Sequence, residues 1–191
     1  MHINTIEQNK QRQDLTSYDD IWLFGYGSLI YKVDFPFLEQ RPAFINGWQR
    51  RFWQGSHDHR GTPEAPGRVV TLIAAEPNTR CYGMAYRVNA DVFEHLDHRE
   101  KNGYLRYEVD IYFSDQQEQK HTGLVYIADP NNSAFLGESN EADIAKQIHH
   151  SHGPSGPNRD YALRLADALN ELGFEDNHVQ EIEKCLKRIV K

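Results

Sequence analysis

The chain has 191 residues, of which 39% are hydrophobic, 12% aromatic and 26% charged, and its formal net charge is -7. This length suits one domain with a real core, since such a chain buries roughly 70% of the surface that its unfolded form exposes. The acidic balance argues against a general nucleic-acid-binding protein, and it requires that any anionic substrate meet locally concentrated positive charge.

The N-terminal segment and the two cysteines indicate the compartment. Residues 1–19 are polar and aperiodic, with no apolar run of a signal peptide, and no stretch approaches the ~20 apolar residues of a membrane span. Cys81 and Cys185 form no CxxC pair, so they indicate a reducing compartment and are expected to be buried or partly buried thiols. We therefore expect a cytoplasmic protein without a membrane partner, with a flexible tail over 1–19 and a single domain over 20–191.

Strand-like runs dominate the first two-thirds of the chain. The clearest is Tyr104–Phe113, where apolar and polar residues alternate as they do in a sheet with one buried face. The expected strands begin with Ile21–Phe24 and continue with Ala43–Phe52, Val69–Ala75, Cys81–Val88, Tyr104–Phe113 and His121–Ala128. Residues 54–67 are loop by composition, and a functional lid and a plain flexible connection are equally open interpretations.

Helices are expected between and after these strands. Asn89 can cap a short helix that starts at Ala90 and ends at Asn102-Gly103. Later apolar stripes with helical spacing predict a helix over 158–173 and a last helix through Val179 and Ile189. With strands first and helices last, the fold class is α+β.

Glu100 is the first candidate for chemistry. It follows Leu96 by four residues and Val92 by eight, so it continues the apolar face of its helix if the last turn holds. A carboxyl group buried there has a raised pKa, which suits a general base that works near neutrality. The alternative is an exposed glutamate in a fraying turn beside Lys101, because helix ends are uncertain by a residue or two.

Gly25-Tyr26-Gly27-Ser28-Leu29 directly follows an apolar strand and is the second candidate. Glycines at a strand end let the backbone turn sharply and point N–H groups at an anion. The sequence is neither a P-loop nor a nucleophile elbow, because the residues that these motifs require are absent. Two interpretations therefore stay open: a backbone site for a carboxylate or an oxyanion, and a plain glycine-rich turn.

Three groups of histidines do not complete a metal site. They are His57 and His59, His95 and His98, and the cluster of His149, His150 and His152. No Cys, Asp or Glu at matching spacing completes a ligand set, so solvated surface histidines are expected and no metal is predicted. For local positive charge the candidates are Arg50, Arg51, Arg68 and Arg106.

Together these residues resemble a known family. From about Ile21 to Leu172 the chain is similar to the ChaC-type, glutathione-specific γ-glutamylcyclotransferases. The matching stretches, in order, are FGYGSLIYKVDFPF, RRFWQGSHDHRG, PGRVVTL, LDHREKNGY, FLG and GPSGPNRDY. Asn102 stands where glycine is common and Phe135 where tyrosine is common, and neither position bears on the expected chemistry.

The resemblance implies an α+β fold around a small, incomplete mixed β-barrel flanked by helices. It implies that Tyr26, Gly27, Ser28 and Leu29 bind the γ-glutamyl group, that Glu100 is catalytic and that Tyr161 assists the substrate. The implied reaction cyclises the γ-glutamyl group of glutathione to 5-oxoproline and releases cysteinylglycine, without a cofactor.

Two alternatives to this function stay open. One is a cyclotransferase for other γ-glutamyl amines or peptides, because the same turn and glutamate would serve both. The other is a non-catalytic sensor or regulator, although mere binding would not require Glu100. The expected partner is the small-molecule substrate, not nucleic acid, and the sequence does not indicate an oligomeric state.

Overall fold

The computed structural model describes residues 4–189, the side chain of residue 118 excepted. The chain forms two compact units, each made of two stretches: unit 1 extends to Gln49 and resumes over Ala74–Ser133, and unit 2 comprises Arg50–Ile73 and continues from Ala134. The single domain over 20–191 stays a prediction.

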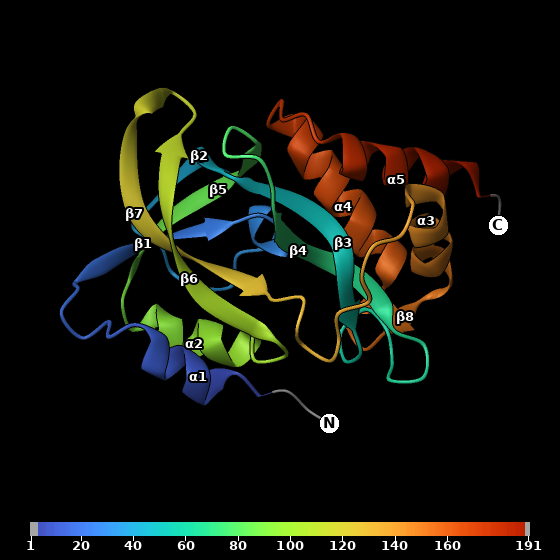
Figure 1. Cartoon of the computed structure of the whole chain (residues 1–191), viewed down its shortest axis with the longest axis horizontal. Helices are drawn as coiled ribbons and strands as arrows, with labels where there is room; N and C mark the ends of the chain where they lie inside the picture. Colours follow the sequence, from blue (N-terminus) through green and yellow to red (C-terminus); the bar gives the residue numbers. More distant parts are fainter. Residues whose placement is uncertain (1–3, 190–191) are drawn as a thin grey trace. The chain divides into compact units, whose positions relative to one another are not determined.

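Unit 1 contains a five-stranded barrel (Figure 1). In barrel order, its strands are β1 (Asp20–Gly25), β5 (Arg80–Asn89), β2 (Glu39–Asn46), β6 (Tyr104–Phe113) and β7 (Gln116–Ala128). Neighbouring strands pair antiparallel except for β1 and β7, which pair in parallel through Trp22–Leu23 and Gly123–Leu124. Large apolar side chains such as Phe24 and Phe44 are fully buried.

The fold class is α+β with a small mixed barrel, as predicted, but the barrel is closed rather than incomplete. Closure depends on the parallel β1–β7 pair, where two segments far apart in sequence come together. Gly123 makes this approach possible, because a Cβ atom there would lie 2.6 Å from the carbonyl oxygen of Trp22. Pattern within one strand carries no information about such a distant neighbour.

Most predicted strands are present, and one prediction joined two strands that the structure separates. β6 has the predicted bounds, whereas the run 43–52 belongs to β2 and to β3 (Trp48–Ser56). Gly47 interrupts that run with φ of 80°, a left-handed conformation that favours glycine. Residues 54–56 of the predicted loop continue β3, so the loop proper covers 57–66.

The described part of unit 1 contains two α-helices, which lie side by side in Figure 1: α1 (Ile6–Arg12) and α2 (Val92–Arg99). Helix α1 corrects the prediction of a flexible tail over 1–19 for residues 6–12 only, and residues 1–3 of that tail lie outside the described residues. The helix was missed because polar rather than apolar side chains anchor it: Thr5 and Asn9 are buried, at 2% and 0% exposure.

Unit 2 combines short strands with three helices. The strands are β4 (Gly67–Ala74), which pairs with β3, and the small pair β8 (His152–Gly153) and β9 (Gly156–Pro157). The helices are α3 (Glu141–His150), α4 (Asn158–Glu171) and α5 (Asn177–Arg188). Among residues 4–189 no helix is both long and apolar enough to cross a membrane.

Candidate active site

Glu100 directly follows the last residue of α2 and is still held by that helix, because its N–H donates to the carbonyl of Leu96 at 2.8 Å. The stripe that begins at Val92 is buried, and the Glu100 side chain one turn beyond Leu96 is only 19% exposed. Burial raises the pKa of Glu100 to about 7, against the attraction of Arg99 and together with the negative charge of Asp34. The alternative interpretation of Glu100 as an exposed residue in a fraying turn is therefore wrong. This carboxyl group can exchange protons near neutrality.

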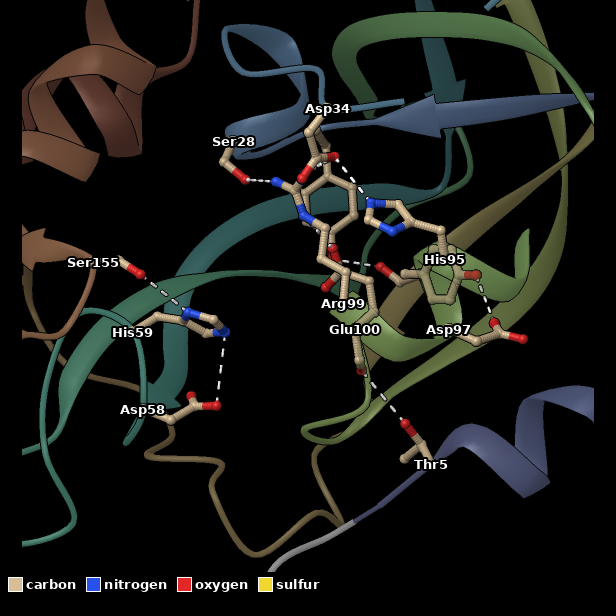
Figure 2. Close-up of polar contacts among 12 residues, drawn as sticks. Thr5, Ser28, Asp34, Asp58, His59, His95, Asp97, Arg99, Glu100 and Ser155 are labelled. Atoms are coloured by element: carbon tan, nitrogen blue, oxygen red, sulfur yellow. Dashed lines mark hydrogen bonds and ion pairs between the residues drawn. The ribbon is translucent and has the colours of Figure 1, made fainter. Parts of the chain in front are cut away.

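Arg99 connects Glu100 to the glycine-rich turn (Figure 2). Its Nε lies 3.6 Å from Oε1 of Glu100, and its Nη2 donates to the Ser28 hydroxyl at 3.1 Å. Its Nη1 pairs with Oδ1 of Asp34, and Nε2 of His95 lies 3.6 Å from the same oxygen. One guanidinium thus brings the two predicted segments, 25–29 and Glu100, to the same place.

The turn itself follows β1 and continues into a short 3₁₀ helix, η1 (Ser28–Ile30). Gly25 is needed for space, because a Cβ atom there would lie 2.8 Å from Cβ of Leu29. The carbonyl of Leu29 accepts a hydrogen bond of 2.5 Å from the Tyr86 hydroxyl, which fixes the turn on the barrel. Ser28 and Leu29 begin η1, and the N–H groups of a first helical turn lack partners within their helix, so this turn has the geometry of an anion site.

A buried polar network supports the helix that carries Glu100. The Tyr126 hydroxyl donates to Asp97 of α2 at 2.6 Å, and the Tyr126 carbonyl accepts from the Tyr26 hydroxyl at 2.6 Å. Nε of Arg106 lies 3.5 Å from the same Asp97 oxygen, and both side chains of this pair are at most 4% exposed. Burial raises the pKa of Asp97, while Tyr126 and Arg106 act in the opposite direction. The Tyr26 phenol therefore connects the turn to β7.

Of the predicted site residues, Tyr26, Gly27, Ser28, Leu29 and Glu100 all lie in unit 1. Tyr161 lies in unit 2, where its hydroxyl accepts a hydrogen bond from the N–H of Val70 at 3.2 Å and its ring packs edge-on against Phe52. The residue is 7% exposed. A role for Tyr161 toward a substrate stays a prediction.

Sequence reasoning did not include Arg99 among its candidates for local positive charge, although its guanidinium contacts Glu100, Ser28 and Asp34. Of its four candidates, Arg50 and Arg106 form buried ion pairs, Arg68 donates to backbone carbonyls and Arg51 donates to the carbonyl of Arg50. Direct adjacency to Glu100 in the chain was the one signal for Arg99.

Histidines do not assemble a catalytic or metal centre in the described part of the chain. No group of three or more His, Cys, Asp or Glu side chains is placed there to hold a metal ion. His59 lies 3.2 Å from the Ser155 hydroxyl and 3.7 Å from Asp58, which is too long for the hydrogen bond that orients the base of a serine nucleophile. Cys81 is buried and Cys185 partly buried, both as free thiols, as predicted.

Comparison with protein families and known sequences identifies the family of the chain. Residues 21–189 match the family model described as ChaC-like protein. Gamma-glutamylcyclotransferase 2-3 of Arabidopsis thaliana is 47% identical, over 89% of this chain and 90% of that protein. Glutathione-specific gamma-glutamylcyclotransferase 1 of Homo sapiens is 41% identical, over 85% of this chain and 76% of that protein. The chain belongs to the ChaC-like family.

A solved structure supports the same placement at the level of the fold. The crystal structure of the γ-glutamyl cyclotransferase specific to glutathione from yeast superposes on this chain with a TM-score of 0.84, at 31% sequence identity. The match covers 90% of this chain and 97% of the yeast chain. The chain and that enzyme therefore share their architecture over nearly their whole length.

Proposed function

We propose that the protein is a γ-glutamylcyclotransferase that degrades glutathione to 5-oxoproline and cysteinylglycine. The observation that carries this proposal is a largely buried carboxyl group, Glu100, with a pKa raised to about 7 beside the cation of Arg99 and the turn at Ser28. The relatives in human and yeast carry the name of this activity in full.

The proposed reaction needs no nucleophile from the protein. The α-amine of the γ-glutamyl group attacks its own γ-carbonyl, a C–N bond closes the five-membered lactam, and the amide bond to cysteine breaks. Because both reacting groups belong to one molecule, holding them in the attacking geometry supplies much of the rate. Two protons leave the α-ammonium nitrogen as it becomes the lactam N–H, and the amide nitrogen gains two as it departs as an ammonium group. As a carboxylate, Glu100 takes a proton from the first nitrogen and returns it to the second in each transfer, so protons balance over the cycle.

The glycine-rich turn provides the complementary binding groups. In this proposal, the N–H groups of Gly27, Ser28 and Leu29 bind the α-carboxylate or the oxyanion that develops at the γ-carbonyl. Arg99 meets the need of an acidic protein for local positive charge, and the substrate's α-carboxylate can replace Asp34 as its partner. Tyr26 contributes by fixing the turn rather than by a free hydroxyl.

A broader substrate range is the second candidate, because the Arabidopsis relative at 47% identity is named without reference to glutathione. Competition assays with other γ-glutamyl amines distinguish the two. We also propose a cytoplasmic location, in keeping with two free cysteines.

The direct test is incubation of the purified protein with glutathione in the presence of a chelator. We expect equimolar 5-oxoproline and cysteinylglycine, since lactam closure requires no metal. Release of glutamate instead of 5-oxoproline would show hydrolysis, and no turnover of any γ-glutamyl compound would favour the sensor.

The pH dependence should report Glu100. Only the carboxylate accepts a proton, so kcat/KM is expected to fall as the pH drops through about 7, the value to which burial raises the pKa of Glu100. The measurement is kcat/KM for glutathione across this range. A decline that begins only near 4.5, the ordinary value for glutamate, would show that the free enzyme does not bury this group.

A further inference from the structure

Helix α1 precedes the part of the chain that matches the family model, yet it contacts the segment that carries Glu100. The N–H of Thr5 donates to the carbonyl of Lys101 at 2.9 Å, and the Thr5 hydroxyl lies 3.4 Å from the carbonyl of Glu100. Asn4 and Asn102 form an isolated β-bridge beside these contacts. The first residues of the described chain thus run along the turn that ends α2.

The hydroxyl of Thr5 bonds outside its own helix rather than capping it. Thr5 stands at the N-cap of α1, where threonine usually accepts a hydrogen bond from its own helix, but it makes no such bond here. The carbonyls at the end of a helix lack partners within that helix. Thr5 donates instead to the carbonyls of Glu100 and Lys101, the two residues that directly follow α2, so α1 forgoes a local cap for a contact with the Glu100 segment.

Asn9 fixes α1 one turn beyond Thr5, on the same face of the helix. Its side-chain amide donates to the carbonyl of Tyr104 at 3.1 Å, and its side-chain oxygen accepts from the N–H of Arg106 at 2.8 Å. The carbonyl of Asn9 also accepts from the Arg106 guanidinium, and Arg12 donates to the carbonyl of Arg106 at 2.6 Å. Because a buried amide is stable only when hydrogen-bonded, this fully buried asparagine commits α1 to one position on β6.

The contacts of Asn9 extend to the helix that carries Glu100. Arg106, held by Asn9, pairs with Asp97 of α2, and Asp97 accepts from the Tyr126 hydroxyl. Asp97 lies in the last turn of α2. Helix α1 therefore holds α2 through Thr5 at its end and, through Arg106, within its last turn.

We propose that Thr5 and Asn9 are positioning residues for Glu100. By fastening the end of α2, they keep the carboxyl group out of water and aligned with Ser28 and Arg99. This inference rests on the proposed function only where turnover is its readout, since the position of Glu100 can be measured without a substrate.

Three variants of the full chain test the proposal. Asn9→Ala removes the strongest anchor of α1, and Thr5→Val removes one hydroxyl while keeping the shape of the side chain. Gln8→Ala is the matched control, because Gln8 is exposed on the same helix. Since misplacing a catalytic group by about 1 Å costs on the order of 10²-fold, we expect kcat to fall about 10- to 100-fold in Asn9→Ala, by a smaller factor in Thr5→Val and not in Gln8→Ala.

Two measurements by nuclear magnetic resonance need no substrate: hydrogen exchange of the Glu100 N–H, and titration of the Glu100 carboxyl. Loss of the anchors should speed this exchange and lower the pKa of Glu100, because water reaches the carboxylate. The groups that face Glu100 are Arg99, Asp34 and Tyr126, all unchanged in these variants. A general loss of stability would lower Tm without moving this titration.

The decisive result is a comparison within Asn9→Ala. If the α1 amides exchange freely while Glu100 exchange, titration and kcat stay as in the wild type, the proposal is overturned. If Asn9→Ala does not fold, the same measurements are made on Thr5→Val and on Thr5→Ser, which retains the hydroxyl. Equal results for these two variants would overturn the proposal. If the variants change the exchange and the titration of Glu100 but the wild-type protein does not consume glutathione, the proposed function is wrong and the positioning role stands.

Discussion

Glu100→Gln is expected to reduce turnover of glutathione by roughly 10²–10⁴-fold, the usual share of general acid–base catalysis. Glutamine keeps the shape of the side chain and its hydrogen bonding but cannot accept a proton at neutral pH. Substrate affinity should weaken only modestly, through loss of the attraction between carboxylate and ammonium. Single-turnover kinetics with glutathione measure the chemical step, and near-normal rates in a folded variant would remove Glu100 from the mechanism.

The same variant should be stabilised in a defined pH range. The folded state keeps the Glu100 proton up to about pH 7, whereas the unfolded chain releases it near 4.5, so the wild type loses stability between these values. Glutamine has no carboxyl group to titrate. The free energy of unfolding of the variant, relative to that of the wild type, should therefore rise across this range by at most a few kcal/mol, at roughly 1.4 kcal/mol per pKa unit. Glu94→Gln, exposed in the first turn of the same helix, is the control and should change neither stability profile nor turnover.

Acetylating the α-amine of glutathione should abolish turnover, because the amide that results is no longer a nucleophile. The loss should greatly exceed the weakening of binding that follows from removing the ammonium charge. Both effects can be separated by using acetylated glutathione as an inhibitor of the normal reaction and, in parallel, as a substrate. If cysteinylglycine is still released, water is the nucleophile and the mechanism is hydrolytic.

The sequence predicts best where neighbours in the chain decide the structure. Alternation alone gives the bounds of β6, and the apolar stripe of α2 places Glu100 on a buried face. It fails at Gly47, whose left-handed φ divides one apolar run into two strands. It also misses α3, a short helix whose few buried residues, such as Ile144 and Ile148, give a weak stripe.

Within the site, the two segments were predictable and the residue that joins them was not. The glycine-rich turn and Glu100 each have a local signature, whereas Arg99 acquires its role only when the fold brings Ser28 and Asp34 to it. Helix α1 escaped notice for a related reason. Thr5 and Asn9 look like surface residues in sequence, and their burial depends on partners almost a hundred positions away.

The strand pair that closes the barrel also limits the order in which unit 1 can fold. Trp22 pairs with Gly123, so β1 has its second neighbour only after nearly the whole unit has been synthesised. Contacts between such distant segments must overcome the entropy of a long closed loop, which makes folding slow. The turn that follows β1 is therefore complete only late, and because each unit consists of two separate stretches, no single cut in the chain can release either one intact.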